Sequence, residues 1–136
     1  MKYYYGDYER SRLFELGAEK MQIRKTYQEV NPELLFREIR DFTLKQGAVI
    51  GEAKIETYSI PTDSSSFTSR GTLTFKMPDA SGKAEKDCLS AHIVGSAGGE
   101  TKLLLDIDET LFPQEKISAL QSDLDFVLGS FEVKPG

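Results

Sequence analysis

The sequence contains little of the chemistry that most cofactor and disulfide sites need. It has one cysteine, Cys88, one histidine, His92, and no tryptophan. A single cysteine excludes a disulfide framework and a cysteine-based metal cluster within one chain. Cys88 and His92, if they share a strand, are about 13 Å apart, too far for a nucleophile and its base. We therefore expect no cofactor, no metal site and no cysteine–histidine catalysis.

Long apolar runs and an excess of positive charge are also absent. No run approaches the roughly 20 apolar residues that span a bilayer. The N-terminal stretch MKYYYGDYERSR lacks the apolar core of a signal peptide. These features predict a cytoplasmic protein with no membrane span. The net charge of −5 argues against a general affinity for nucleic acid, and we expect no such partner.

The composition is that of an ordinary globular protein. Hydrophobic residues make up 39% of the chain and charged residues 29%, and 136 residues are enough to bury a core. We expect a single domain over residues 1–136. Within it, residues 1–17 form a variable N-terminal arm or edge strands, rich in tyrosine, and residues 18–136 form an α+β core.

Alternating apolar and polar residues predict strands through the middle of the chain. The predicted strands cover 20–30, 48–60, 67–77, 88–96 and about 101–108. Such alternation is typical of an antiparallel sheet with one face in water. In the second of these strands, the residues predicted to share one face are Val49, Gly51, Ala53, Ile55 and Thr57.

Two segments have helical periodicity. Asn31 can cap a helix that Pro32 opens, and Gly47 supplies a stop, so a helix is predicted over 32–46. Pro113 opens a longer C-terminal helix. Its predicted apolar stripe consists of Ile117, Leu120, Leu124, Val127, Leu128 and Phe131.

One motif suggests catalysis. The sequence LLLDIDETL, at 103–111, resembles the first motif of the haloacid-dehalogenase-like phosphatases. That resemblance implies Asp106 as the phosphorylated nucleophile, Asp108 as the acid and base, and magnesium held by both. The family's motif stands on the first strand of a parallel sheet, with its partners on later strands. Here only a helix and a tail follow, so we interpret both carboxylates as the solvent face of a strand.

The order of elements is similar to the helix-grip fold of the START-like, polyketide-cyclase-like superfamily. This resemblance covers Lys20 to the end of the chain and implies a two-layer α+β fold. In it an antiparallel sheet packs on the long C-terminal helix, and an apolar ligand lies between them. The sequence departs from the family by having one continuous helix after the first core strand.

The main hypothesis is a non-enzymatic domain that binds a small, largely apolar molecule between the sheet and the C-terminal helix. The expected ligand-binding residues are Tyr27, Ile55, Phe67, Leu73, Phe75, His92, Leu105, Leu124 and Leu128. Core packing alone also explains each of the apolar members. One alternative is an interaction protein, a homodimer or a hetero-complex, that uses the tyrosine-rich arm or the outer sheet face. The other is a magnesium-dependent phosphatase that uses Asp106 and Asp108.

Overall fold

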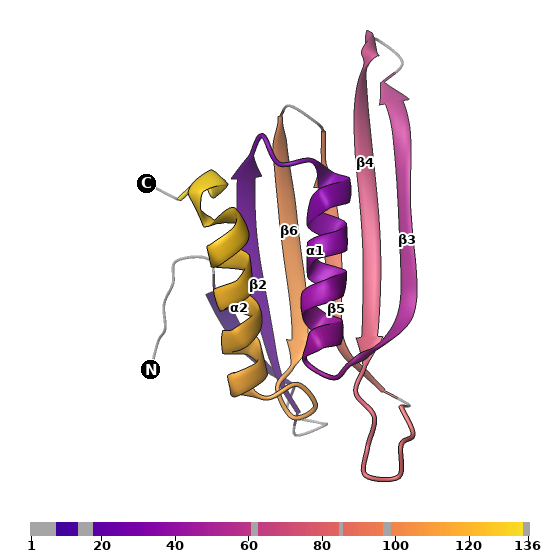
Figure 1. Cartoon of the computed structure of the whole chain (residues 1–136), viewed down its shortest axis with the longest axis vertical. Helices are drawn as coiled ribbons and strands as arrows, with labels where there is room; N and C mark the ends of the chain where they lie inside the picture. Colours follow the sequence, from indigo (N-terminus) through magenta and orange to yellow (C-terminus); the bar gives the residue numbers. More distant parts are fainter. Residues whose placement is uncertain (1–7, 14–17, 61–62, 85, 97–98, 135–136) are drawn as a thin grey trace.

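The computed structural model describes residues 8–13, 18–60, 63–84, 86–96 and 99–134, and the tyrosines at positions 3–5 lie outside these ranges. Within these ranges the chain forms six strands, two α-helices and a final 3₁₀ turn (Figure 1). In chain order these are β1 (Tyr8–Leu13), β2 (Ala18–Gln28), α1 (Pro32–Lys45), β3 (Val49–Ile60), β4 (Asp63–Lys76), β5 (Asp87–Gly95), β6 (Glu100–Asp108), α2 (Gln114–Leu128) and η1 (Gly129–Phe131).

All strands belong to one antiparallel sheet with the order β1-β2-β6-β5-β4-β3. Both helices lie side by side on one face of this sheet, and no helix in the described ranges covers the other face (Figure 1). The fold is therefore α+β, with an antiparallel sheet, a helix after the first core strand and a C-terminal helix packed against the sheet, as predicted. No helix in the described ranges is long and apolar enough to cross a membrane.

Helix α1 begins and ends where its sequence signals stand. The Oδ1 atom of Asn31 accepts a hydrogen bond from the backbone N–H of Glu33 at 2.8 Å, and Pro32 occupies the first turn. Gly47 follows the helix with φ +97°, a left-handed conformation that glycine adopts without strain. The capping residues thus fix both ends of the helix.

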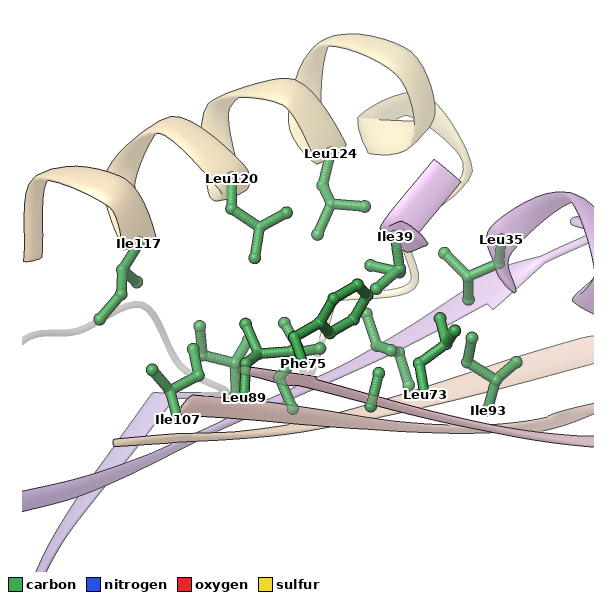
Figure 2. Packing of buried hydrophobic residues seen from close by; sticks show 14 of the residues in the cluster. Leu35, Ile39, Leu73, Phe75, Leu89, Ile93, Ile107, Ile117, Leu120 and Leu124 are labelled. Atoms are coloured by element: carbon green, nitrogen blue, oxygen red, sulfur yellow. The ribbon is translucent and has the colours of Figure 1, made fainter. Parts of the chain in front are cut away.

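The core lies between the two helices and the inner face of the sheet (Figure 2). From α2, the side chains that point inward are Ile117, Leu120, Leu124 and Leu128. The prediction was wrong for the other two members of the stripe, because Val127 is 40% exposed and Phe131 is 46% exposed. The α-helix ends at Leu128, and the tighter turn of η1 moves Phe131 off the helical stripe.

A bulge near the start of β3 changes which residues share a face. Ile50 pairs with Phe75 and Glu52 pairs with Thr74, the adjacent residue of β4, so Gly51 is an extra residue. A Cβ on Gly51 would meet Thr74 Oγ1, on the outer face. The predicted face was therefore wrong for Gly51. It was also wrong for Val49, which lies opposite Lys76. After the bulge, Ala53, Ile55 and Thr57 do alternate together as expected.

Candidate functional site

Most residues predicted to bind a ligand lie together between the sheet and the helices. Tyr27, Leu73, Phe75, Leu105 and Leu124 have no exposed surface, and Leu128 is 2% exposed. Figure 2 shows Phe75 and Leu73 on the sheet side and Leu124 on the helix side of this layer. The sequence pattern thus located the interior of the fold.

The other predicted ligand residues lie elsewhere. Ile55 is half-buried against the edge of the core. Phe67 belongs to β4, but its side chain lies outside the described part of the structure. His92 is exposed on the outer face, because its neighbours Ala91 and Ile93 point inward. From that position His92 cannot contact a molecule held between sheet and helix.

The interior is closed. Because Tyr27, Leu73, Phe75, Leu105 and Leu124 have no accessible surface, these side chains do not line a space that would admit a water molecule. Such packing is normal for a protein core and differs from a preformed ligand pocket. A ligand at these residues would first have to displace a helix or rearrange the side chains.

Cys88 and His92 occupy different environments on β5. Cys88 is buried, and burial raises the pKa of its thiol to about 11. The thiol is therefore protonated at neutral pH and a poor nucleophile. His92 is exposed, so the arrangement does not provide a thiolate with an adjacent base.

The carboxylates of the phosphatase-like motif have local partners on an antiparallel strand. Asp106 Oδ1 accepts a hydrogen bond from Gln22 Nε2 at 2.7 Å across β2 and β6. Asp108 Oδ1 accepts from the backbone N–H and the hydroxyl of Thr110, at 3.0 and 2.6 Å, and so shapes the turn that ends β6. Lys20 lies 3.7 Å from the other oxygen of Asp108. These contacts give both carboxylates a structural role.

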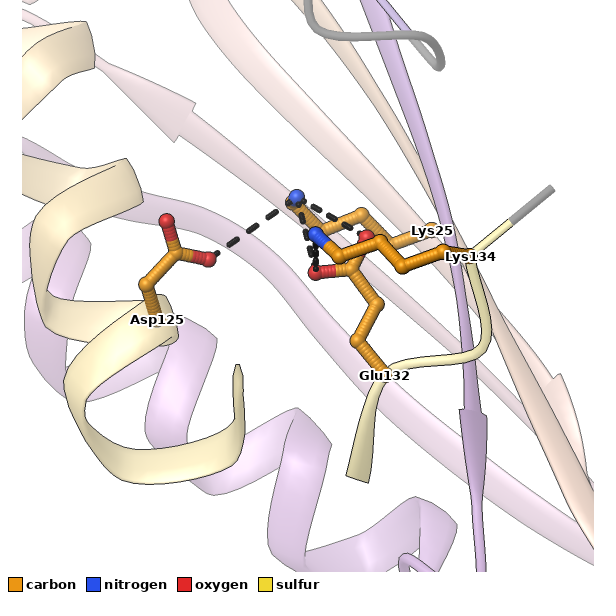
Figure 3. Close-up of polar contacts among 4 residues, drawn as sticks. All are labelled: Lys25, Asp125, Glu132 and Lys134. Carbon is orange, nitrogen blue, oxygen red and sulfur yellow. Dashed lines mark hydrogen bonds and ion pairs between the residues drawn. The ribbon is translucent and has the colours of Figure 1, made fainter. Parts of the chain in front are cut away.

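The structure also contains a buried ion pair that sequence reasoning missed (Figure 3). Lys25 lies between Ile23 and Tyr27 on the inner side of β2 and is only 8% exposed. Its Nζ atom is 3.3 Å from Glu132 Oε2 and 4.0 Å from Asp125 Oδ1. The alternation of β2 could have indicated an inward lysine, but no pattern in the sequence links it to a carboxylate so distant along the chain.

This pair attaches the C-terminal segment to β2. The side chain of Glu132 is 2% exposed and also contacts the Nζ atom of Lys134 at 3.1 Å. Burial raises the pKa of Glu132, but the Lys134 hydrogen bond and the charge of Lys25 outweigh it, so the pKa lies below its ordinary value. Next to this pair, the backbone N–H of Val133 donates to the carbonyl of Thr26 at 2.8 Å. The charges therefore serve to hold the tail.

β3 forms an exposed edge of the described sheet. β3 is the outermost strand of the described sheet and has 12 residues, without proline. Ile55 is half-buried, whereas Val49, Ile50 and Tyr58 are 40 to 47% exposed. At the opposite edge, the described part of β1 has 6 residues, and Glu132 forms an isolated β-bridge with Tyr27 of β2. A long strand with exposed apolar side chains at a sheet edge is a surface that can pair with another chain.

The end of the β3–β4 hairpin extends this edge beyond the rest of the sheet (Figure 1). β4 begins at Asp63, but β5 pairs with it only from Ser69 onward. The first part of β4 therefore has β3 as its strand partner among the described residues. This arrangement places the second half of β3 where another polypeptide could approach without contacting the helices.

Charges on the outer side of β3 alternate in sign. Glu52, Lys54, Glu56 and Tyr58 lie on this side, and Lys54 Nζ is 3.5 Å from Glu56 Oε1. The hydroxyl of Tyr58 donates to Glu56 Oε1 at 2.9 Å, which raises the pKa of Tyr58. Since these groups are exposed, their own pairings contribute little to stability. They can instead determine which strand pairs with the edge, and in which register.

Among the described residues, no group of three or more histidine, cysteine or acidic side chains could hold a metal ion. Comparison of the chain with models of protein families, with curated proteins and with solved structures gives no match. The candidate site therefore rests on the geometry of the chain itself, and the edge strand β3 is the feature that this geometry favours.

Proposed function

We propose that this protein is a non-enzymatic interaction domain that binds an extended polypeptide segment along the open edge of β3. In this mode the added segment becomes a further antiparallel or parallel strand of the sheet. Backbone hydrogen bonds supply affinity, and side chains on both faces of the new strand supply specificity. The observation that carries the proposal is the long exposed strand at the sheet edge.

The contrast between the two edges supports this proposal. Proteins commonly protect sheet edges with short strands, proline, charged side chains, bulges or a covering segment. At the β1 edge the described strand has 6 residues, and a C-terminal segment is bridged to β2. Among the described residues no segment covers β3, whose only such devices are the bulge at Gly51 and the charge of Lys54, and Val49, Ile50 and Tyr58 are exposed along it. An interaction surface gives a physical reason for leaving such an edge open.

Binding of an apolar ligand in the interior, which the helix-grip resemblance implied, remains a second proposal without support from the packing. Leu73, Phe75 and Leu124 have no accessible surface between the layers. A thermal-shift screen with fatty acids, sterols and aromatic compounds tests it directly. A rise in the unfolding midpoint that disappears in Leu124→Ala would favour the ligand over the edge.

A peptide-display selection tests the interaction directly. Random peptides of the same length as β3 are selected against the immobilised full chain, and the affinity of each enriched peptide is measured by fluorescence anisotropy. Adjacent residues in a strand direct their N–H groups to opposite edges. Of the two variants Glu56→Pro and Thr57→Pro, one therefore removes a backbone N–H that points away from β4 and keeps the β3–β4 hydrogen bonds. The other removes an N–H that bonds to β4 and so weakens the fold.

The proline variant that keeps the β3–β4 ladder, and therefore stays folded, is compared with His92→Ala. The His92→Ala variant alters an exposed side chain on the central strand β5. We expect peptide affinity to fall at least tenfold in the proline variant and to stay unchanged in His92→Ala. Failure to enrich any peptide, or equal affinity in the proline variant, would contradict the proposed function.

A further inference from the structure

We infer that the strand added to β3 is β3 of a second copy of this chain, paired antiparallel about a two-fold axis at Ile55. This inference rests on the proposed function, because it names the partner of the same edge. It follows from the order of the side chains along β3 and from the part of the strand that is regular. The product is a continuous sheet shared by two copies.

Symmetry restricts the possible registers. Residues directly opposite in an antiparallel pair point to the same face of the sheet. A two-fold axis perpendicular to the sheet preserves the faces, so the axis must lie midway between a residue and the same residue of the second copy. Both pairs of helices then lie on the same side of the shared sheet. The regular part of β3 lies between the irregularities at Ile50/Glu52 and Ser59/Ile60. Any self-pairing is therefore centred on one residue within this part.

The charge order selects Ile55 as the centre. With the axis there, Lys54 lies opposite Glu56 of the second copy, Glu52 lies opposite Tyr58, and Ile55 lies opposite itself. Each copy then contributes one lysine and one glutamate to two equivalent cross-strand ion pairs, which are favourable.

The neighbouring registers are unfavourable. An axis at Lys54 places the two lysines against each other and Glu52 against Glu56. An axis at Glu56 places two carboxylates in direct opposition. Like charges opposite each other destabilise a strand pair. An axis at Ala53 or Thr57 leaves only a short overlap within the regular part of β3. The register at Ile55 is thus the longest one free of like-charge pairs.

The exposed charges on β3 then have a clear role. A lysine in the middle of an edge strand generally discourages pairing with other chains. In the Ile55 register, Lys54 has two carboxylate neighbours. Its own Glu56 is 3.5 Å away, and Glu56 of the second copy lies opposite it. The same side chains therefore disfavour pairing with strands of other charge order and favour pairing with β3 of a second copy, which is how an interface becomes specific.

Charge reversal at Lys54 and Glu56 tests the pairing. Because both side chains are exposed, these substitutions should change the stability of the fold little. The dimer dissociation constant of the full chain is measured by sedimentation equilibrium for wild type, Lys54→Glu, Glu56→Lys and the double variant. Each single reversal changes both ion pairs to like-charge pairs, and we expect dimerisation to weaken about tenfold or more. The double variant restores opposite charges across the axis, and its dimer should recover to near the wild-type value.

Cross-linking tests the register. Ile55→Cys places two thiols directly opposite, within about 4.5–5.5 Å at Cβ, which is close to disulfide range. In the matched variant Ala53→Cys, the two thiols are about 13 Å apart along the strands. We expect rapid oxidation to a covalent dimer for Ile55→Cys only. The wild type carries only buried Cys88 and serves as the background.

The outcomes separate this inference from the proposed function. A monomer at millimolar concentration, a dimer insensitive to Lys54→Glu, or equal cross-linking of Ala53→Cys would overturn self-pairing in this register. If the monomer still binds selected peptides and loses them in the edge proline variant, the proposed function stands and only the partner changes. If neither dimer nor peptide binding is found, both fail.

Discussion

The buried pair Lys25–Glu132 gives a sharp prediction about stability. Glu132→Ala removes the nearer carboxylate from a lysine whose side chain is 6% exposed, while Asp125 stays 4.0 Å away. Breaking a buried ion pair by removing one partner typically costs 3–5 kcal/mol. Because Asp125 still offsets part of the charge, we expect a loss of about 3 kcal/mol, near the lower end of that range.

For a domain of this size, such a loss corresponds to a fall in Tm of about 10 °C. The free energy of unfolding is measured at pH 7 by urea titration with circular dichroism and tyrosine fluorescence, since the chain has no tryptophan. Lys134→Ala is the matched control, because Lys134 contacts the same carboxylate but its side chain is 70% exposed. We expect the control to lose at most about 0.5 kcal/mol.

The pH dependence follows from the lowered pKa of Glu132. A carboxyl with a lower pKa in the folded state stabilises the fold fully above its ordinary pKa of about 4.3. This contribution is lost as the pH falls through the lower folded value. The stability difference between wild type and Glu132→Gln should therefore be largest at neutral pH and shrink in acid. Equal stability of Glu132→Ala and Lys134→Ala at pH 7, or a difference that grows in acid, would refute the reasoning.

Three further predictions concern the core. Gly71→Ala should cost about 1–3 kcal/mol in urea unfolding, because its Cβ would lie 2.7 Å from the ring of Phe36; an unchanged urea midpoint would contradict that packing. Leu124→Ala should cost about 2–5 kcal/mol, whereas Phe126→Ala, at a side chain 92% exposed, should stay within about 0.5 kcal/mol; equal losses would show that α2 is oriented differently. With its pKa near 11, Cys88 should react with a thiol reagent at pH 8 far more slowly in the folded chain than in urea, and equal rates would contradict its burial.

Much of the fold could be predicted because its local signals agree. The cap at Asn31, the stop at Gly47 and the alternation of β4, with Leu73 and Phe75 inward, each act over a few residues. The strand and helix boundaries therefore came out close to those of the structure. Errors arose where the period breaks, at the bulge of Gly51 and at the 3₁₀ turn after α2.

The candidate site was less predictable because its features depend on strand order. β3 has the same alternation as the inner strands, and the sequence alone does not place it at the edge. Likewise, alternation alone did not indicate that Lys25 meets Glu132, since the two are brought together only when the tail returns to β2. The predicted ligand residues, such as Leu105 and Leu124, are fully buried, so packing in the core is sufficient to explain why they are apolar.

The central claim, that the edge of β3 pairs with another copy, is tested most directly by hydrogen exchange of its backbone amides. Exchange is followed by NMR at a low and a high protein concentration, with β5 amides as the internal reference. We predict that alternate amides between Glu52 and Tyr58 become protected at high concentration, while β5 amides do not change. Exchange rates along β3 that are independent of concentration would contradict the account.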